Sequence, residues 1–359
     1  MKHSSKNIAI ICNYQLYANR IGGMDRFYLA YDAKAKKLGY EVDWFFSNHE
    51  EFEFYSNLSI YSSKGQQSVE VFFREFCLQN NQQYHTVVTH FTELCTPFYK
   101  WIKHYHNAHV LAVDHNPRPL DGFPLKKRLK NKFKGLWYSK YIDQFIAVSN
   151  YTKKHILNDY GRFLNIKTVV VYNGIDVEVF KKRISNNKNK FIVASHLRKS
   201  KGIQDLIRAV SFLGDDTKKQ IKIDIYGEGP YEEFLKTLTK ELAIKNCIHF
   251  KGSSSKLHEL FCSYNYMLQP TYMECFSLSI LESLSANVPV ITTQVGGNLE
   301  VITHGENGFI YQAGDVKALS KIIENIVLQK SVITKDVSTL VVKHYYLEEM
   351  VDEHIKLID

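Results

Sequence analysis

The stretch Tyr266-Met-Leu-Gln-Pro-Thr-Tyr-Met-Glu-Cys-Phe-Ser-Leu-Ser-Ile-Leu-Glu-Ser-Leu284 runs from a short apolar strand through a polar break into a helix. The break falls at Gln269-Pro270-Thr271, since proline and polar residues favour a loop. Apolar side chains then recur at helical spacing, at Phe276, Leu278, Leu281 and Leu284. This order of strand, loop and helix is the repeating unit of a parallel α/β sheet.

Two glutamates in this stretch, Glu274 in the loop and Glu282 in the helix, suit the binding of a nucleotide-linked sugar. The N-terminus of the helix has free N–H groups from about Cys275 to Leu278 and is the positive end of the helix dipole. Together these features favour the binding of a diphosphate. Each carboxylate can accept hydrogen bonds from a sugar diol, one on the hexose side and one on the ribose side. We place Glu282 roughly two turns into the helix, and from there its side chain points back toward the helix N-terminus. The alternative is a solvated surface Glu274 and an ordinary helical Glu282.

The composition indicates a globular protein of two domains. The chain has 359 residues, which fits two cores of about 150–180 residues each. Its apolar content of 45% and charged content of 23% are ordinary for a soluble protein. The net charge of +9 favours acidic partners such as nucleotide diphosphates, anionic lipid surfaces or nucleic acid, without choosing among them.

The sequence predicts a cytoplasmic protein. Its start, Met1–Lys6, is polar, and the following apolar run is too short for a signal peptide or a membrane span. The cysteines form no Cys-x-x-Cys pair and no cluster with histidine at zinc-ligand spacing. They are expected to be buried, reduced thiols, at Cys12, Cys77, Cys95, Cys247, Cys262 and Cys275.

Short apolar runs alternate with helical patterns in both halves of the chain. The strands predicted in the first half are Asn7–Cys12, Val42–Phe46, Thr86–Thr89, His109–Val113, Gln144–Val148 and Thr168–Tyr172. The helices between them are Met24–Leu38, Val69–Gln79, Pro97–Tyr105, Leu125–Tyr141 and Tyr151–Asp159. The alternation restarts with strands at Phe191–Ala194, Ile221–Tyr226, Cys247–Phe250, Tyr266–Leu268 and Val288–Thr292, each followed by a helix. This pattern predicts an α/β protein of two doubly wound domains that face a cleft, with ligands at the carboxyl ends of the strands.

The domain boundaries follow from a polar run, Lys181–Lys190, that has no apolar period and is typical of a linker. We predict an N-terminal, acceptor-side domain over residues 1–178 and a linker over 179–189. A C-terminal, donor-binding domain is predicted over 190–338. A helical tail, 339–359, is expected to return to the N-terminal domain.

Three further loops follow predicted strands. Gly22-Gly23 opens a helix, where backbone without side chains can approach a phosphate, although a plain turn explains it equally. Lys201, just before Gly202, can neutralise a departing phosphate with Arg198 as a bidentate partner, and the alternative is a solvated basic loop. Gly227-Glu228-Gly229 makes a tight turn with a ligand expected nearby.

Together these residues resemble the retaining glycosyltransferases of the GT-B fold, family 4. The resemblance covers essentially the whole chain and is strongest from Val171 to Asp315. Its landmarks are Gly22-Gly23 with Asp25-Arg26, Ser149, Asn173-Gly-Ile-Asp176, Lys201-Gly202, Gly227-Glu-Gly-Pro230, Phe250-Lys-Gly252, Glu274 with Glu282, Pro289–Thr293, Gly296-Gly-Asn-Leu-Glu300 and Asn307-Gly-Phe309. Each landmark alone is weak, and their order and spacing make the signal strong.

The resemblance implies a role for each matched residue. Glu274 would hold hydroxyls of the donor sugar and Glu282 the ribose, while His115 lies close to the reacting sugar. Lys201 would counter the charge of the diphosphate. The other donor-binding residues implied are Gly22, Gly23, Arg198, Gly229, Cys275, Phe276, Ser277 and Leu278. The alternative for His115 is a hydrogen-bonded histidine at a strand end, and for His90 that alternative is favoured.

Two residues depart from the family pattern. Glycine usually follows the first glutamate, and Cys275 in its place would narrow the room for the sugar or shift the backbone. An arginine usually stands five positions before the lysine, where this chain has His196, and we expect Arg198 to compensate.

The resemblance implies transfer of a hexose-type sugar from a nucleoside diphosphate with retention of configuration, by front-side attack assisted by the departing phosphate. UDP-sugars are favoured over GDP-sugars as co-substrate. No metal constellation is visible, so no obligatory metal and no other cofactor is expected. Because no far-face carboxylate is evident, double displacement is not expected.

The acceptor is predicted to be a glycan or a lipid-linked glycan in the biosynthesis of a cell-surface polysaccharide such as capsule or lipopolysaccharide. The helix Leu125–Tyr141 has an apolar stripe among lysines and could lie on an anionic membrane. The alternative is that the stripe packs on the sheet and the lysines are merely solvated.

Two other functions stay open. A GT-B epimerase or phosphorylase could share the site. A nucleic-acid-binding protein would explain the charge, but the sequence contains no nucleic-acid-binding signature and no such partner is expected. The sequence leaves the oligomeric state open.

Overall fold

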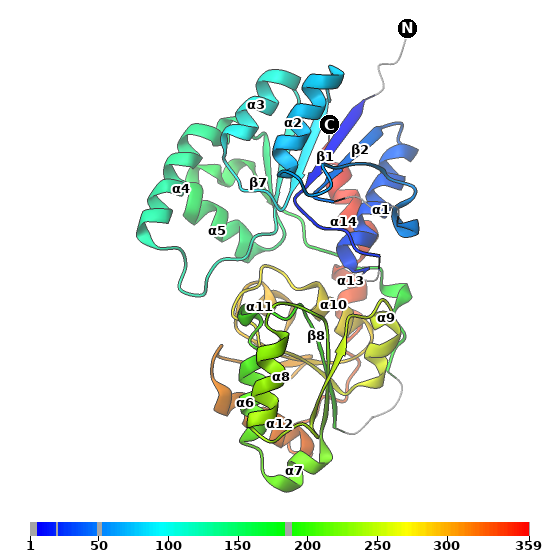
Figure 1. Ribbon diagram of the computed structural model, residues 1–359, viewed down its shortest axis with the longest axis vertical. Helices are drawn as coiled ribbons and strands as arrows, with labels where there is room; N and C mark the ends of the chain where they lie inside the picture. The colour runs from blue at the N-terminus through cyan, green and yellow to red at the C-terminus, as the bar shows by residue number, and fades with distance from the viewer. Residues whose placement is uncertain (1–5, 19–20, 49–51, 184–188, 359) are drawn as a thin grey trace. The chain divides into compact units, whose positions relative to one another are not determined.

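The computed structural model describes residues 6–18, 21–48, 52–183 and 189–358. The chain divides into two compact units, the first formed by Met1–Asn173 with Leu347–Asp359 and the second by Gly174–Tyr346. Each unit contains one parallel sheet covered by helices (Figure 1). The predicted α/β class with two doubly wound domains is confirmed.

Unit 1 is built on a seven-stranded parallel sheet in the order β3-β2-β1-β4-β5-β6-β7. The strands are β1 (Asn7–Cys12), β2 (Glu41–Phe46), β3 (Ser59–Tyr61), β4 (Thr86–His90), β5 (His109–Asp114), β6 (Gln144–Ala147) and β7 (Thr168–Val170). The helices are α1 (Gly23–Lys37), α2 (Val69–Asn80), α3 (Pro97–His106), α4 (Leu125–Tyr138), α5 (Asn150–Tyr160) and α14 (Leu347–Ile355).

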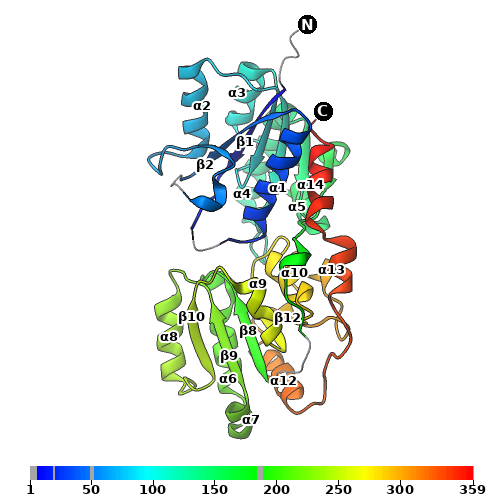
Figure 2. The same ribbon diagram turned by 90° about the vertical axis from the view of Figure 1, so that its right-hand side faces the viewer.

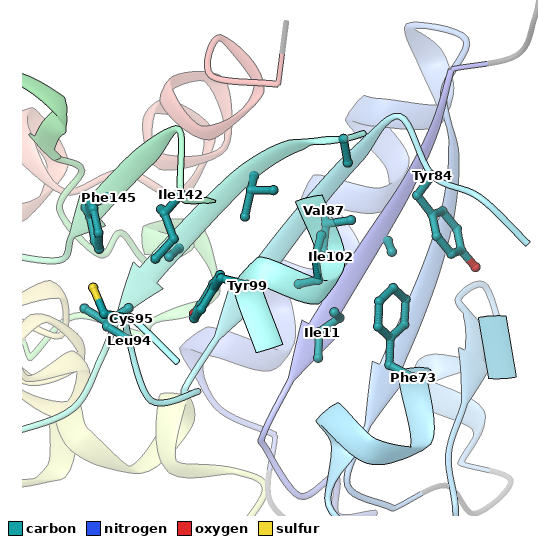
Figure 3. Close-up of a cluster of buried hydrophobic side chains, with 14 of the residues drawn as sticks. Ile11, Phe73, Tyr84, Val87, Leu94, Cys95, Tyr99, Ile102, Ile142 and Phe145 are labelled. Atoms are coloured by element: carbon teal, nitrogen blue, oxygen red, sulfur yellow. The ribbon is translucent and has the colours of Figure 1, made fainter. Parts of the chain in front are cut away.

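Strand β2 shows how the sequence forms both faces of this sheet, because successive side chains of a strand point to opposite faces. Phe45 packs against Phe73 of α2, with ring centroids 4.8 Å apart. Its neighbour Trp44 packs on the other face against Tyr28 of α1 and donates from Nε1 to Asp32 at 2.9 Å. The core on the α2 face also takes in Tyr99 and Ile102 from α3 (Figure 3), and it includes Ile156 and Tyr160 from α5.

Helix α14 lies beside α1 on the face opposite to that core, as both views show (Figures 1 and 2). Lys34 of α1 pairs with Asp352 of α14 at 2.7 Å. The last described residues continue to the strands, where Thr86 Oγ1 donates to the carbonyl oxygen of Ile358 at 3.2 Å. The end of the chain is therefore part of unit 1.

Unit 2 is built on a six-stranded parallel sheet in the order β10-β9-β8-β11-β12-β13. The strands are β8 (Lys190–Ala194), β9 (Lys222–Tyr226), β10 (Ile248–Gly252), β11 (Tyr266–Gln269), β12 (Val290–Thr293) and β13 (Gly308–Tyr311). The helices are α6 (Ile203–Ser211), α7 (Asp215–Gln220), α8 (Glu232–Glu241), α9 (Leu257–Leu260), α10 (Leu278–Ser285), α11 (Asn298–Val301), α12 (Val316–Val327) and α13 (Thr339–His344).

The structure differs from the predicted boundaries at the ends of the second domain. Unit 2 begins at Gly174, before the predicted linker, of which residues 184–188 lie outside the described part. Helix α13 belongs to unit 2, where it packs beside α10, and only the segment from Leu347 onward belongs to unit 1. Val341 of α13 is fully buried, which explains why the predicted tail is divided.

Two short strands, β3 and β13, were not predicted. Strand β3 has only three residues and lies at the edge of its sheet, so it gives little apolar alternation. Strand β13 directly follows Asn307, in a stretch where turn residues dominate the pattern.

Candidate functional site

Lys201 and Glu274 come together in unit 2, at the carboxyl ends of β8 and β11. Lys201 Nζ lies 2.8 Å from Glu274 Oε2, and the two side chains are 25% and 16% exposed. Both charged groups are therefore partly in contact with water. The fold brings them together although they lie 73 positions apart in the sequence. The predicted phosphate-binding cation and the predicted sugar-binding carboxylate form one ion pair.

Two glycines make this pair possible because backbone carbonyls lie where their side chains would be. Gly202 has φ +69°, and a Cβ on it would lie 1.7 Å from the Pro270 carbonyl oxygen. Gly296 has φ +66°, and a Cβ there would lie 2.1 Å from the Glu274 carbonyl oxygen. The loops after β8 and β12 thus press against the two ends of the Glu274 loop.

The N-terminus of α10 follows directly, with Ser277 as the N-cap. Its Oγ accepts from the Ile280 N–H at 3.4 Å and from Gln269 Nε2 at 2.5 Å. The amides of Leu278 and Ser279 precede this capped N–H and have no intrahelical acceptor. Glu282 lies just over one turn into the helix rather than about two, since α10 begins at Leu278.

Cys275 stands where the family usually has a glycine. Cys275 is buried, and its carbonyl oxygen accepts from Gly297 N–H at 2.8 Å. The neighbouring Phe276 is also buried and packs against Tyr345.

Arg198 is exposed and forms no ion pair within the described part of the chain. Its guanidinium is therefore available to a ligand.

Gly227 and Gly229 pack against the loop that carries Arg198. A Cβ on Gly227 would lie 1.9 Å from the Ser195 carbonyl oxygen, and one on Gly229 would lie 2.4 Å from that of Leu197. Leu197 N–H donates to the Glu228 carbonyl oxygen at 2.9 Å. This close packing accounts for both glycines without a ligand.

In unit 1, Gly22 is the N-cap of α1 and Gly23 its first residue. The Gly22 N–H donates to Asp25 Oδ2 at 2.7 Å. The other carboxylate oxygen, Oδ1, accepts from the Tyr55 hydroxyl at 2.7 Å. A carboxylate of the protein therefore already uses one of the amides that we predicted for the diphosphate.

His115 belongs to a group of buried histidines in unit 1. Its Nε2 lies 3.0 Å from His90 Nδ1, and the His90 ring lies 6.0 Å from that of His354 on α14. Burial lowers the pKa of His115 to about 4 and that of His354 to about 3. Burial also lowers the pKa of His90. His115 is therefore a neutral imidazole at physiological pH.

These shifts predict a stability that falls in acid. Because the unfolded histidines titrate near 6.5, the unfolded chain binds more protons than the folded chain at pH between about 4 and 6.5. Stability should be highest above that range and decrease by at most about 1.4 kcal/mol per pH unit for each histidine. A His354→Phe variant should lose part of this slope, since Nε2 has no hydrogen-bond partner among the described residues and Phe27 packs on the ring.

Urea unfolding of the full chain at pH 7.5 and at pH 5 measures this difference. The exposed His104 on α3 provides the control variant, His104→Phe, which should keep the wild-type slope. Equal slopes for wild type and His354→Phe would contradict the assignment.

Helix α4 exposes the apolar stripe that the sequence predicts. Leu125, Phe133 and Trp137 are 69%, 59% and 67% exposed, and Leu129 and Leu136 are also exposed. The side that packs on α5 is formed by Asn131 and by Gly135, on which a Cβ would lie 2.0 Å from the Tyr160 carbonyl oxygen. The alternative, in which the stripe packs on the sheet, is therefore wrong.

Arg118 is a buried, ion-paired residue that the sequence analysis did not select. It is buried after β5 and pairs with Asp114 at 2.8 Å and Asp159 at 2.9 Å. Its place between Pro117 and Pro119, directly after a strand, was the signal available. Such a signal marks a fixed loop, but it does not indicate the distant Asp159.

Metal-binding clusters and membrane-spanning helices are both absent from the described residues. Among them, no group of three or more histidine, cysteine or carboxylate side chains is placed to hold a metal ion. The described helices include none that is long and apolar enough to cross a membrane.

The fold of the chain is that of known GT-B glycosyltransferases. The Anabaena protein HepE, solved in complex with UDP and glucose, superposes with a TM-score of 0.76 at 18% identity over 98% of each chain. Residues 21–179 match the family described as Glycosyltransferase Family 4, and residues 175–336 match Glycosyl transferases group 1. The chain belongs to the GT-B glycosyltransferases of family 4, so the predicted fold and family are confirmed.

Two curated relatives are more similar in sequence. N-acetyl-alpha-D-glucosaminyl L-malate synthase of Bacillus anthracis is 34% identical over 160 residues, which is 42% of each chain. The capsular polysaccharide biosynthesis glycosyltransferase CapM of Staphylococcus aureus is 29% identical over 206 residues, or 52% of each chain. The matches thus span about half or less of these relatives.

Proposed function

We propose that this protein is a retaining glycosyltransferase that moves a hexose-type sugar from a nucleoside diphosphate to a hydroxyl of a glycan or lipid-linked glycan. The observation that carries the proposal is the Lys201–Glu274 pair beside the N-terminus of α10. A cation, a carboxylate and helix amides are together the groups that a sugar diphosphate needs. The role in cell-surface polysaccharide synthesis is supported by the similarity to CapM.

In the proposed reaction, the bond between the anomeric carbon and the diphosphate oxygen breaks as the acceptor oxygen bonds on the same face. The acceptor proton passes to the departing phosphate oxygen. As negative charge develops on the departing phosphate, the Lys201 ammonium group moves partly from Glu274 toward the phosphate oxygens. The exposed Arg198 adds a second cation beside them. Glu274, relieved of part of its pairing, accepts hydrogen bonds from sugar hydroxyls.

His115 is proposed to lie near the reacting sugar. Because burial lowers its pKa to about 4, it acts as a neutral hydrogen-bonding group rather than as a cation. Its contact with His90 at 3.0 Å and its stacking on Phe91 fix the orientation of the ring.

The donor test is a thermal-shift screen with UDP, GDP and ADP sugars. A ligand that binds only the folded state raises the melting temperature by mass action, and at 100 times Kd the gain is about 2.7 kcal/mol. UDP-sugars should give the largest shift, and Glu282→Ala should reduce it because the ribose loses its acceptor. Glu241→Ala, at an exposed position on α8, should behave as wild type. The absence of a shift with every nucleotide sugar would contradict the donor assignment.

The acceptor is proposed to be presented at an anionic membrane, on which α4 lies. The exposed stripe of α4 is flanked by cationic side chains, at Lys126, Lys127, Arg128, Lys130 and Lys132. Such a helix inserts its apolar face at the headgroup boundary while its lysines attract anionic lipid. The localisation that follows is peripheral, on the inner face of the cytoplasmic membrane.

Flotation with phosphatidylglycerol vesicles tests the membrane contact. The wild type should float at low salt and less at 0.5 M salt, because salt screens the lysines. Replacing Leu129, Phe133 and Trp137 with serine should weaken binding by at least about tenfold, since each loses apolar area buried in lipid. Serine at the exposed residues Phe212, Phe234 and Leu299 of unit 2 is the control. A wild type that stays in the bottom fraction at low salt would contradict the contact.

A further inference from the structure

The hydroxyl of Ser277, the N-cap of α10, receives two hydrogen bonds that both end on its oxygen. Its Oγ accepts from the Ile280 N–H at 3.4 Å and from Gln269 Nε2 at 2.5 Å. A hydroxyl oxygen has two lone pairs and one hydrogen. Because both lone pairs are in use, the hydroxyl can only donate, and none of the residues that the structure describes accepts this hydrogen.

A series of buried hydrogen bonds fixes the amide of Gln269 in this orientation. Asn298 Nδ2 donates to Thr292 Oγ1 at 3.0 Å. The Thr292 hydroxyl in turn donates to Gln269, whose carbonyl oxygen and Oε1 lie at 3.1 and 3.4 Å. Because Oε1 of Gln269 faces the Thr292 hydroxyl, the NH₂ group of the same side chain faces Ser277.

The members of this series are shielded from water, so water does not compete for their hydrogen bonds. Gln269, Thr292 and Asn298 are 4%, 0% and 1% exposed. Every bond donates in the direction of Ser277. Hydrogen bonds aligned in this way polarise one another, and the hydroxyl at the end of the series becomes a stronger donor.

Ser277 is placed to meet the phosphates of the donor. It directly precedes the free amides of Leu278 and Ser279, and it follows the loop of Glu274, which pairs with Lys201. The Ser277 side chain is 6% exposed, so the surrounding residues do not cover it completely. Phosphate oxygens are acceptors only, and a hydrogen bond to such an anion is stronger than one between neutral groups.

We propose that the Ser277 hydroxyl donates a hydrogen bond to a phosphate oxygen of the donor, and that Gln269 is the positioning residue that keeps the hydroxyl a donor. The proposal rests on the proposed transferase function and adds a side-chain contact to the amides of α10. A nucleoside without phosphate offers no partner for this contact. The hydroxyl therefore contributes to the recognition of the diphosphate and not of the base.

The test compares UDP with uridine, which differ only by the diphosphate, as inhibitors of donor turnover by the full chain. Ser277→Ala should raise the Ki of UDP about tenfold or more, because a hydrogen bond to a charged group is lost. Ser277→Thr, which keeps both the hydroxyl and the N-cap, should stay within about threefold of wild type. The Ki of uridine should be the same in all three proteins.

A double-mutant cycle tests the role of Gln269. Gln269→Met has a similar size but no N–H, so it frees a lone pair of Ser277 and should raise the Ki of UDP about three- to tenfold. In the Ser277→Ala background the same change should have no further effect, because Gln269 acts through the hydroxyl. Gln220→Met, at an exposed position on α7, is the matched control and should behave as wild type.

The two proposals fail in different ways. If the Gln269 amide pointed the other way, Ser277 would donate to it, and a folded Ser277→Ala protein would bind UDP as tightly as wild type. That result, or an equal rise in the Ki of uridine, would overturn the phosphate contact and leave the transferase function intact. Additive losses in the cycle would make Gln269 merely structural. A wild type that shows neither turnover nor inhibition by UDP would overturn the proposed function itself.

The melting temperature of each variant without ligand shows whether it is folded, since loss of an N-cap also lowers stability. If Gln269→Met does not fold, Asn298→Leu takes its place in the cycle. This change removes the first donor of the series and leaves Gln269 and Ser277 in place. It should raise the Ki of UDP in the wild-type background only, and a rise in the Ser277→Ala background would contradict the series.

Discussion

Replacing Lys201 with alanine is expected to lower the rate of donor turnover by about 10²–10³-fold, because one preorganised donor to the leaving phosphate is lost. The substitution also leaves Glu274 without its partner at 2.8 Å. Since both side chains are partly exposed, water can solvate the carboxylate, and the fold should persist. The measurement is nucleotide release at saturating donor, together with the circular dichroism spectrum and the melting temperature of the variant.

The control for this prediction is Lys199→Ala. Lys199 lies two positions earlier in the same loop and is exposed, and it forms no ion pair in the described part of the chain. Its loss removes the same charge from the loop without touching Glu274. Undiminished turnover in a folded Lys201→Ala enzyme would remove Lys201 from the site, and an equal loss in both variants would indicate an effect of general charge.

Replacing Arg118 with methionine is expected to destabilise unit 1 by about 3–5 kcal/mol, because Asp114 and Asp159 would be left buried and unpaired. Asp114 is 1% exposed and Arg118 is 5% exposed, so water cannot take the place of the guanidinium. For a unit of this size the change corresponds to a fall of roughly 6–20 °C in Tm. Calorimetry of the full chain measures it, since two units can unfold in separate transitions.

Lys134→Met is the matched control for Arg118→Met. It breaks the ion pair with Glu93, whose side chain is 57% exposed, and should cost less than about 1 kcal/mol. An Arg118→Met protein that melts at the wild-type temperature would show that the buried pairs contribute nothing to stability.

The sheets were predictable because buried parallel strands are short apolar runs between helical patterns. The Lys201–Glu274 pair was not predictable, although both residues were selected. Their contact depends on Gly202 and Gly296, whose missing side chains let three loops approach one another. Sequence spacing contains no information on such an approach between separate loops.

The orientation of α4 shows a second limit. The pattern predicted an apolar stripe, but the same period describes a face against a core and a face against lipid. What decided the orientation was Gly135, since only glycine lets α4 approach the backbone of Tyr160. His354 shows a third limit, because nothing near it in the sequence indicates that α14 lies against His90.

Nucleotide release from the best UDP-sugar, with and without a glycan acceptor, tests transfer to an acceptor most directly. Without an acceptor, we expect nucleotide release to be slow. The rate of release should rise with the concentration of octyl glycoside, and the glycosylated product should have the anomeric configuration of the donor. A rate of nucleotide release that does not change with any acceptor, or conversion of the donor to another nucleotide sugar, would contradict the transferase function. Either result would favour an epimerase or a phosphorylase.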